Sequence, residues 1–170
     1  VSAAEAFIDI SLETAGAAAV NFPFLNQSLD AVADMLNNKT VVMGLADAGA
    51  HVGQIMDASH PTFFLTYWVR EKGLCSIEEG IRRLTSDTAG LFGIKERGVL
   101  TPGAFADINV IDLDGMRLPT PEYVHDFPGG AGRYIQGSSG YDYTIVNGQV
   151  FMDHGVHTDT LAGRVVRSQA

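Results

Sequence analysis

The sequence predicts an α/β fold over residues 1–98 and a β-rich segment over residues 99–170, and we expect these to be two domains. Three observations support this division. The run Thr40–Leu45 is apolar without polar alternation, which indicates a strand buried on both faces of a parallel sheet. Helical patterns stand on both sides of that run. After Gly98 the apolar residues alternate with polar ones, which is typical of antiparallel strands.

The first part of the chain is expected to alternate helices with strands. Ala3–Glu13 and Leu29–Asn37 carry apolar residues at helical spacing, and Ser28 is placed to cap the second helix. Between them, Val20–Leu25 predicts a short strand, which Pro23 disfavours. A helix between two strands predicts a right-handed crossover and a parallel strand pair.

Three further helices are expected before residue 98. Pro61 suits the first turn of an aromatic-rich helix over Thr62–Lys72, whose aromatic residues are interpreted as a core stripe or, alternatively, as a wall of a substrate pocket. Ser76 and Glu79 have the spacing of a capping box at the start of the next helix. Thr85–Phe92 predicts one more short helix.

The β-rich segment contains the clearest local signal in the sequence. Ala106–Leu113 alternates as a strand does, and Leu118–Gly140 is rich in Pro, Gly and Ser, which predicts a long loop. Asn147 and Gly148 stand between two alternating runs. This pair predicts a two-residue hairpin with a type I′ turn over residues 142–153.

The composition argues against several classes of partner. The formal net charge is −9, from 20 acidic and 11 basic residues, and no basic patch is interleaved with aromatic residues. We therefore expect neither nucleic acid nor a membrane surface as a partner. No apolar run approaches the length of a membrane span, and no signal peptide is visible at the start. The single cysteine, Cys75, fits the reducing conditions of the cytoplasm, where we expect the protein to reside.

Asp47 is the first candidate for chemistry. It directly follows the apolar run, and in α/β folds the functional groups lie just past the carboxyl ends of the strands. A carboxylate at this position, flanked by Gly44 and Gly49, is suited to hold a metal-bound water or to move a proton. The alternative is an aspartate that only caps the next helix.

Three motifs resemble the carboxyl-terminal signature of the metal-dependent amidohydrolase superfamily. The turn G-x-L-x-P-G-x-x-A-D is present as Gly98–Asp107, and the ending I-V-N-G-x-V with a later G-R-V is present as Ile145–Val150 and Gly163–Val165. The segment GLADAGAHVGQ, Gly44–Gln54, resembles the segment after the eighth barrel strand of N-acyl-D-amino-acid deacylases, also called D-aminoacylases. The resemblance extends over nearly the whole chain.

This resemblance implies the last part of a (β/α)8 TIM-like barrel, followed by part of a small β-sandwich. It also implies a divalent metal, usually zinc, that activates a water at the mouth of the barrel. The family's strand-eight aspartate accepts the proton of that water and then protonates the leaving nitrogen. This role transfers to Asp47, which is also a candidate metal ligand. The implied reaction is hydrolysis of a non-peptide C–N bond in a small-molecule amide, an N-acyl-D-amino acid.

The chain departs from the family in its metal ligands. The family binds metal through a His-x-His pair after the first strand, a group in the middle of the barrel, and histidines after strands five and six. This sequence contains no His-x-His, and Ala46 stands where many relatives have serine. A full barrel takes about 250 residues. We therefore expect the chain to be the carboxyl-terminal portion of a longer enzyme and to be inactive alone.

Four other residues are candidates beside Asp47. His51 is expected to shape the mouth of the active site, and Arg133, in a glycine-rich loop, is a candidate to bind a substrate carboxylate. The spacings Asp47/His51 and Asp57/His60 would place each pair on one face of a helix, where it would share a cation.

Two other functions stay open. The first is a non-catalytic module that associates with further copies of itself, since an incomplete barrel exposes strand edges and apolar helix faces such as Phe63–Trp68. On this interpretation the isolated chain forms a homo-oligomer. The second is another amidohydrolase branch, such as a cyclic-amide hydrolase.

His154 and His157 are residue types that bind metals, but they follow a hairpin, and we interpret them as exposed loop histidines.

Overall fold

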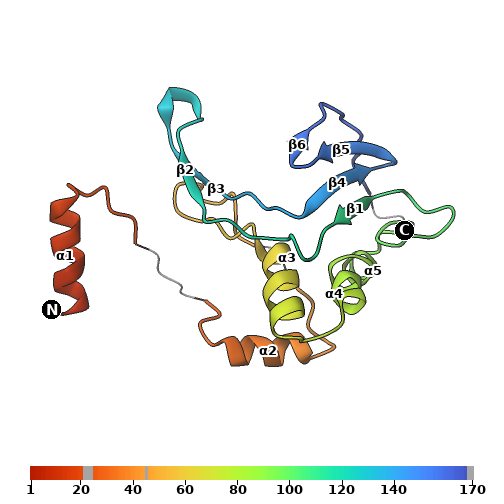
Figure 1. Ribbon diagram of the computed structural model, residues 1–170, viewed down its shortest axis with the longest axis horizontal. Coiled ribbons are helices and arrows are strands. Elements are labelled where there is room, and N and C mark those ends of the chain that lie inside the picture. Colours follow the sequence, from red (N-terminus) through yellow and green to blue (C-terminus); the bar gives the residue numbers. More distant parts are fainter. Residues whose placement is uncertain (21–24, 45, 168–170) are drawn as a thin grey trace. The chain divides into compact units, whose positions relative to one another are not determined.

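The computed structural model describes residues 1–20, 25–44 and 46–167. The chain forms two compact units, Val1–Met35 and Leu36–Ala170, which are described separately (Figure 1). The strand predicted over Val20–Leu25 falls mainly on residues outside the described ranges. Among the described helices, none combines the length and the apolar character needed to cross a bilayer.

The first unit is built from capped helices. Helix α1 (Ala3–Glu13) begins with a capping box, in which Ser2 Oγ accepts the Glu5 N–H (3.2 Å) and the Glu5 carboxylate accepts the Ser2 N–H (2.7 Å). Helix α2 (Leu29–Asn37) starts in this unit, and Ser28 Oγ accepts the Ala31 N–H (3.3 Å). Both helices have the predicted bounds, because their starts are set by local hydrogen bonds that the sequence encodes.

The core of the second unit forms around one continuous helical segment. Helix α3 (His60–Phe63), with Pro61 in its first turn, leads directly into the π-helix η1 (Phe64–Glu71). The segment matches the predicted helix in position. The core-stripe interpretation holds for Phe64 and Trp68 but not for Phe63, which is 39% exposed. The buried members are Phe64, Leu65, Trp68 and Val69.

Two short helices follow this segment, of which α4 packs against η1 and α5 packs against α4. In α4 (Ile77–Leu84), Ser76 Oγ accepts the Glu79 N–H (3.3 Å) as predicted. The Glu79 carboxylate instead accepts hydrogen bonds from Arg82 and Arg83, so only half of the predicted capping box forms. The second helix, α5, spans Ser86–Leu91 within the range predicted for it.

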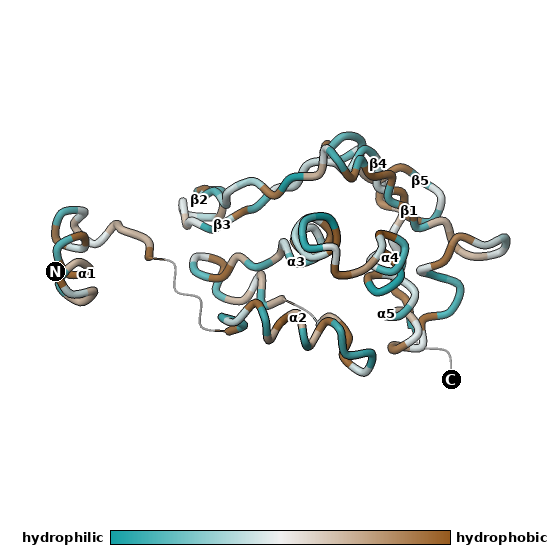
Figure 2. Tube along the Cα trace, turned by 60° about the horizontal axis from the view of Figure 1, so that its bottom comes forward, coloured by the Kyte–Doolittle hydropathy of each residue, from teal (hydrophilic) through white to brown (hydrophobic). Residues whose placement is uncertain are grey.

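The sheet of the second unit is antiparallel throughout. Its strand order is β1-β4-β5-β6, with β1 at Ile108–Ile111, β4 at Tyr141–Val146, β5 at Gln149–Asp153 and β6 at Val156–His157 (Figure 1). The stretches around β1 and β4 are rich in apolar residues (Figure 2). Asn147 (φ 49°) and Gly148 (φ 79°) join β4 to β5, and two successive positive φ angles are what a type I′ turn requires. The predicted hairpin is therefore confirmed.

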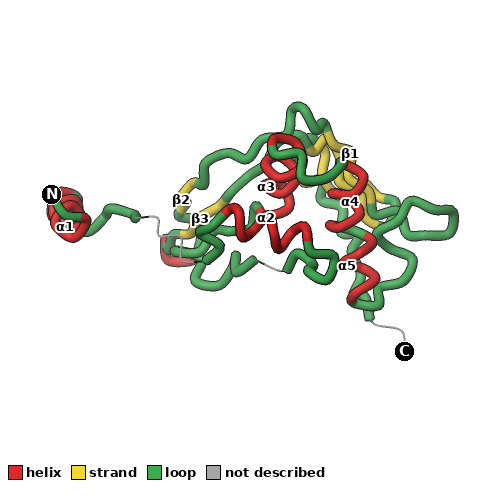
Figure 3. Tube along the Cα trace, turned by 90° about the horizontal axis from the view of Figure 1, so that it is seen from below, coloured by secondary structure: helices red, strands yellow, loops and turns green. Residues whose placement is uncertain are grey.

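A second hairpin lies where a long loop was predicted. Strands β2 (Glu122–Val124) and β3 (Arg133–Ile135) pair antiparallel, and the 3₁₀ turn η2 (Pro128–Gly130) lies between them (Figure 3). The prediction of loop over Leu118–Gly140 was thus wrong for these strands. Each has only three residues, too few to show a period, and they are held by packing between Tyr123 and Tyr134, whose rings meet edge to face at 4.9 Å.

The strand predicted over Thr40–Leu45 is not formed by its described residues. Residues 40–44 have no regular structure, and Val41 and Val42 are each 44% exposed. A strand needs a neighbour for its backbone hydrogen bonds, and no parallel strand pair exists in the described part of the chain. The expected parallel pair was therefore wrong here, and the fold is a mixed helix and sheet arrangement without a closed barrel in the described residues.

The motif Gly98–Asp107 and the motif Ile145–Val150 contact each other directly. The Asp107 carboxylate accepts the Asn147 N–H (2.9 Å), and Ala106 C=O accepts the Gly148 N–H (2.9 Å). Arg97 bridges the pair, binding Asp107 and also donating to Asn147 Oδ1 (2.8 Å). Asn147 Nδ2 in turn donates to the carbonyl of the buried Ala162 (2.6 Å). The motif residues therefore connect the turn before β1 to the β4–β5 hairpin through hydrogen bonds.

Candidate functional site

Asp47 begins a solvent-exposed loop, which we call the Asp47 loop and define as residues 47–57. Its turns are closed by hydrogen bonds from Ala50 N–H to Asp47 C=O (3.0 Å) and from Gln54 and Ile55 N–H to His51 C=O (2.7 and 3.1 Å). Gly49 (φ 95°) and His51 (φ 50°) are left-handed, which no continuous α-helix permits. The helical spacing that was expected to pair Asp47 with His51 therefore does not apply.

The Asp47 carboxylate does not cap the helix that follows it. The next helix begins at His60, and the residue before it is Ser59. The interpretation of Asp47 as a cap for the following helix was therefore wrong. The side chain is exposed instead, at the start of a loop without regular structure.

Asp57 closes the Asp47 loop. One oxygen of its carboxylate accepts the backbone N–H of Asp47, with an N–O distance of 3.1 Å. This contact joins residues ten positions apart in the sequence. The two acidic residues are thereby brought together, whereas the sequence had paired Asp57 with His60.

The middle of the Asp47 loop is tied to the β2–β3 hairpin. Val52 C=O accepts the Tyr134 N–H (3.0 Å), which extends β3 by one hydrogen bond to the loop. Gly53 lies close to the same hairpin, since a Cβ atom at this position would be 3.7 Å from the Tyr123 hydroxyl. The structure therefore brings the loop of Asp47 against the strand that carries Arg133.

Arg133 has a partner of its own. Its guanidinium donates two hydrogen bonds to the Asp126 carboxylate (2.8 and 2.7 Å) and lies over the Phe127 ring, 5.1 Å from the centroid. The hydrogen bonds from Arg133 lower the pKa of Asp126, and the same bonds raise the pKa of Arg133. A substrate carboxylate would have to displace or share this ion pair, so the substrate-binding role of Arg133 stays a prediction.

The histidines fall into two groups. His51, His125, His154 and His157 are exposed, and the hydrogen bond with Asp153 (2.6 Å) raises the pKa of His154. The interpretation of the latter two as exposed histidines is confirmed. His60 differs, because its Nδ1 atom is buried without a hydrogen-bond partner in the described part of the chain.

The described residues do not form a metal site by themselves. Within residues 1–20, 25–44 and 46–167, no three His, Cys, Asp or Glu side chains are grouped so that they would hold an ion. Asp47 would supply one ligand at most, so the residues present do not fit a complete metal centre. Cys75 is half-buried, and burial raises the pKa of its thiol, which fits its interpretation as apolar filler.

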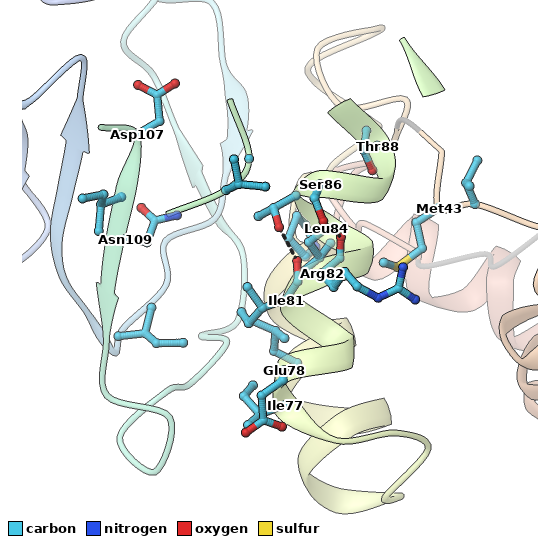
Figure 4. A pocket seen from close by; sticks show the side chains of 18 of the residues that line it. Met43, Ile77, Glu78, Ile81, Arg82, Leu84, Ser86, Thr88, Asp107 and Asn109 are labelled. Atoms are coloured by element: carbon cyan, nitrogen blue, oxygen red, sulfur yellow. Dashed lines mark hydrogen bonds between the residues drawn. The ribbon is translucent and has the colours of Figure 1, made fainter. Parts of the chain in front are cut away.

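A large cavity lies elsewhere in the second unit. It has a volume of about 1080 Å³ and separates helices α4 and α5 from strand β1 (Figure 4). Its walls are mainly apolar, with Ile77, Ile81 and Leu84 on one side and Ile108 and Ile111 on the other. None of Asp47, His51 and Arg133 lines it. Titratable side chains also line this cavity, among them Glu78 and Asp107, but Asp107 is bound by Arg97 and by the Asn147 N–H. The candidate site is therefore the Asp47 loop, which contains Asp47 and His51 and contacts the strand of Arg133.

Comparison with known proteins identifies the class of this chain. Residues 4–152 match the Amidohydrolase family, and the chain belongs to that family. It is similar to a solved D-aminoacylase described as defining a novel subset of amidohydrolases, with 30% identity, 62% of this chain and 20% of that chain covered, and a TM-score of 0.47. A second D-aminoacylase structure, described for the functional role of its binuclear metal center, has the same identity, coverage and TM-score. A comparison with curated sequences gave no match.

The chain spans about a fifth of the length of these D-aminoacylases.

Two features of the site were not predicted from the sequence. The contact of Asp57 with Asp47 has no local signal, whereas the β2–β3 hairpin has one in the Pro-Gly-Gly turn at 128–130.

Proposed function

We propose that this chain supplies the carboxyl-terminal part of the active site of an amidohydrolase that acts on N-acyl-D-amino acids, with Asp47 as general acid and base. The observation that carries the proposal is the position of Asp47, whose exposed carboxylate begins a hydrogen-bonded loop. Membership of the Amidohydrolase family supports the reaction class. The similarity of the chain to D-aminoacylases supports the substrate class.

The proposed chemistry assigns two proton transfers to one carboxylate. Amide hydrolysis needs a base that takes a proton from the attacking water, and an acid that protonates the leaving nitrogen. Asp47 would accept the proton as the water oxygen bonds to the carbonyl carbon, and would release the same proton to nitrogen as the C–N bond breaks. The products are a carboxylic acid and a D-amino acid, and Asp47 returns to its starting state.

The remaining parts of the site are proposed to come from the rest of the enzyme. We propose a divalent metal, zinc, whose ligands other than Asp47 lie outside the described residues, since these contain no ligand group of three. His51 would line the mouth of the site from within the Asp47 loop. Arg133 would bind the carboxylate of the substrate, at the cost of opening its ion pair with Asp126.

A chimeric enzyme tests this proposal. This chain would replace the corresponding segment of a D-aminoacylase, and hydrolysis of N-acetyl-D-amino acids would be measured. We expect Asp47→Asn to lower kcat by about 10²–10⁴-fold, because the amide cannot carry the proton. Arg133→Gln should instead raise KM by about 10–100-fold, the effect of losing one charged hydrogen bond of about 1.5–3 kcal/mol.

The control is Asp34→Asn, which neutralises an exposed carboxylate on α2. It should leave both constants unchanged. The isolated chain should show no turnover. Full activity of the Asp47→Asn chimera would contradict the role of Asp47 as general acid and base. Turnover by the pure chain that Asp47→Asn abolishes would contradict the expectation that the chain is inactive alone.

A further inference from the structure

We infer that Asp57 is a positioning residue for Asp47. This inference rests on the proposed function, because it adds a second acidic residue in support of the same carboxylate. Asp57 would not touch the substrate. It would hold the backbone of Asp47, so that the Asp47 side chain leaves the chain in one direction.

The geometry of the contact carries the inference. The Asp57 carboxylate accepts the Asp47 N–H itself, with an N–O distance of 3.1 Å. The backbone hydrogen bonds of the loop use the carbonyls of Asp47, His51 and Val52 and leave the Asp47 N–H for Asp57. The peptide plane before Asp47 is bonded to its Cα atom, so a fixed N–H restricts the direction in which Cβ and the carboxylate point.

Asp57 is well placed to impose order because it adjoins a rigid element. Helix α3 begins at His60 and continues into η1, whose Phe64 and Leu65 are buried in the core. The middle of the Asp47 loop is anchored separately, through Val52 and the Tyr134 N–H. The loop is therefore held at its two ends by Asp57 and at its centre by β3.

The chemistry of the acceptor explains why a carboxylate suits this position. A carboxylate presents two acceptor oxygens and no donor to the Asp47 N–H, and the amide oxygen of an asparagine would accept the same bond. An exposed loop otherwise samples many conformations, of which few place a catalytic group correctly. A supporting side chain of this kind typically changes activity by about 10–100-fold.

The first test uses this chain alone and measures hydrogen exchange of the Asp47 amide by NMR. We expect slow exchange in the native chain, at least tenfold faster exchange in Asp57→Ala, and near-native exchange in Asp57→Asn, whose amide oxygen still accepts the bond. Asp34→Ala is the matched control and should leave the Asp47 amide unchanged. Equal exchange in the native chain and in Asp57→Ala would overturn the inference.

The second test uses the chimeric enzyme. Asp57→Ala should lower kcat by about 10–100-fold with little change in KM, and Asp57→Asn should recover most of the loss. If Asp47→Asn abolishes activity while Asp57→Ala does not reduce kcat, the positioning role is wrong and the proposed function stands. If Asp47→Asn leaves activity intact, the proposed function fails even where the Asp47 amide is protected. A loss of activity in Asp57→Asn equal to that in Asp57→Ala would also overturn the role as hydrogen-bond acceptor.

Discussion

At the scale of single residues, hydrogen bonds explain the presence of Asp107 at the end of the motif Gly98–Asp107. Asp107 is partly buried, which by itself raises its pKa, but the hydrogen bonds from Asn147 N–H and Arg97 more than compensate and lower the pKa below the usual value of 3.8. A carboxyl group with a lowered pKa in the folded state stabilises the fold when it is ionised. That contribution is fully present above the pKa of the unfolded chain, and is lost as the pH falls through the lower pKa of the folded chain.

This sign gives a pH-dependent prediction for Asp107→Asn. At pH 7 the substitution should lower the free energy of unfolding by about 1–2 kcal/mol, the low part of the range for charged hydrogen bonds, because the Asp107 side chain is 31% exposed. Below about pH 4 the difference between variant and native chain should shrink, since the native carboxyl becomes protonated. Urea unfolding at pH 7 and at about pH 3 checks this, and a difference independent of pH would contradict it.

At the scale of elements, Gly80 sets how closely α4 approaches η1. It is buried within α4, and a Cβ atom at this position would lie 2.9 Å from Val69 Cγ2 and 3.5 Å from Phe64 Cε1. Val69 is β-branched and stiff, so it does not move aside easily. Gly90 in α5 is the contrasting case, because a Cβ atom there meets nothing within 4 Å.

We therefore expect opposite effects of the same substitution on the two helices. Gly90→Ala should raise the free energy of unfolding by about 0.5–1 kcal/mol, the gain in helix propensity. Gly80→Ala should lower it by about 1–3 kcal/mol through overpacking. Denaturant unfolding measures both, and Val69→Ala combined with Gly80→Ala should recover part of the loss. An equal gain at both positions would show that α4 and η1 are not in close contact.

The elements also show what a sequence reveals about its fold. Ser28 and Ser76 cap their helices, and Asn147-Gly148 forms its turn, because each acts through hydrogen bonds or φ angles within a few residues. The run Thr40–Leu45 was misjudged because its strand character depends on neighbouring strands. The site divides in the same way. A local motif identifies Asp47, whereas Asp57 and Asp126 take their roles from contacts that no local pattern encodes.

At the scale of the whole molecule, the second unit leaves apolar side chains in contact with water. Leu91, Phe92 and Leu100 are 60%, 66% and 76% exposed, and all three also line the cavity between the helices and β1. Among the described residues, strand β1 pairs with β4 alone, so its other edge has no strand partner there. Monomeric proteins seldom expose such patches and edges, because these bind other chains. In the isolated chain this surface is available to a second copy of the chain, whatever the function of the longer enzyme.

The isolated chain is therefore predicted to self-associate through this patch. Sedimentation velocity over a wide concentration range should show a dimer or larger species, and Leu91→Glu combined with Phe92→Glu should shift the chain to monomer. Leu161→Glu is the matched control, because Leu161 is 88% exposed but does not line the cavity. A native chain that stays monomeric at all concentrations would exclude self-association. Dissociation by Leu161→Glu to the same extent would place the contact on another surface, since a charge weakens only the interface into which it is buried.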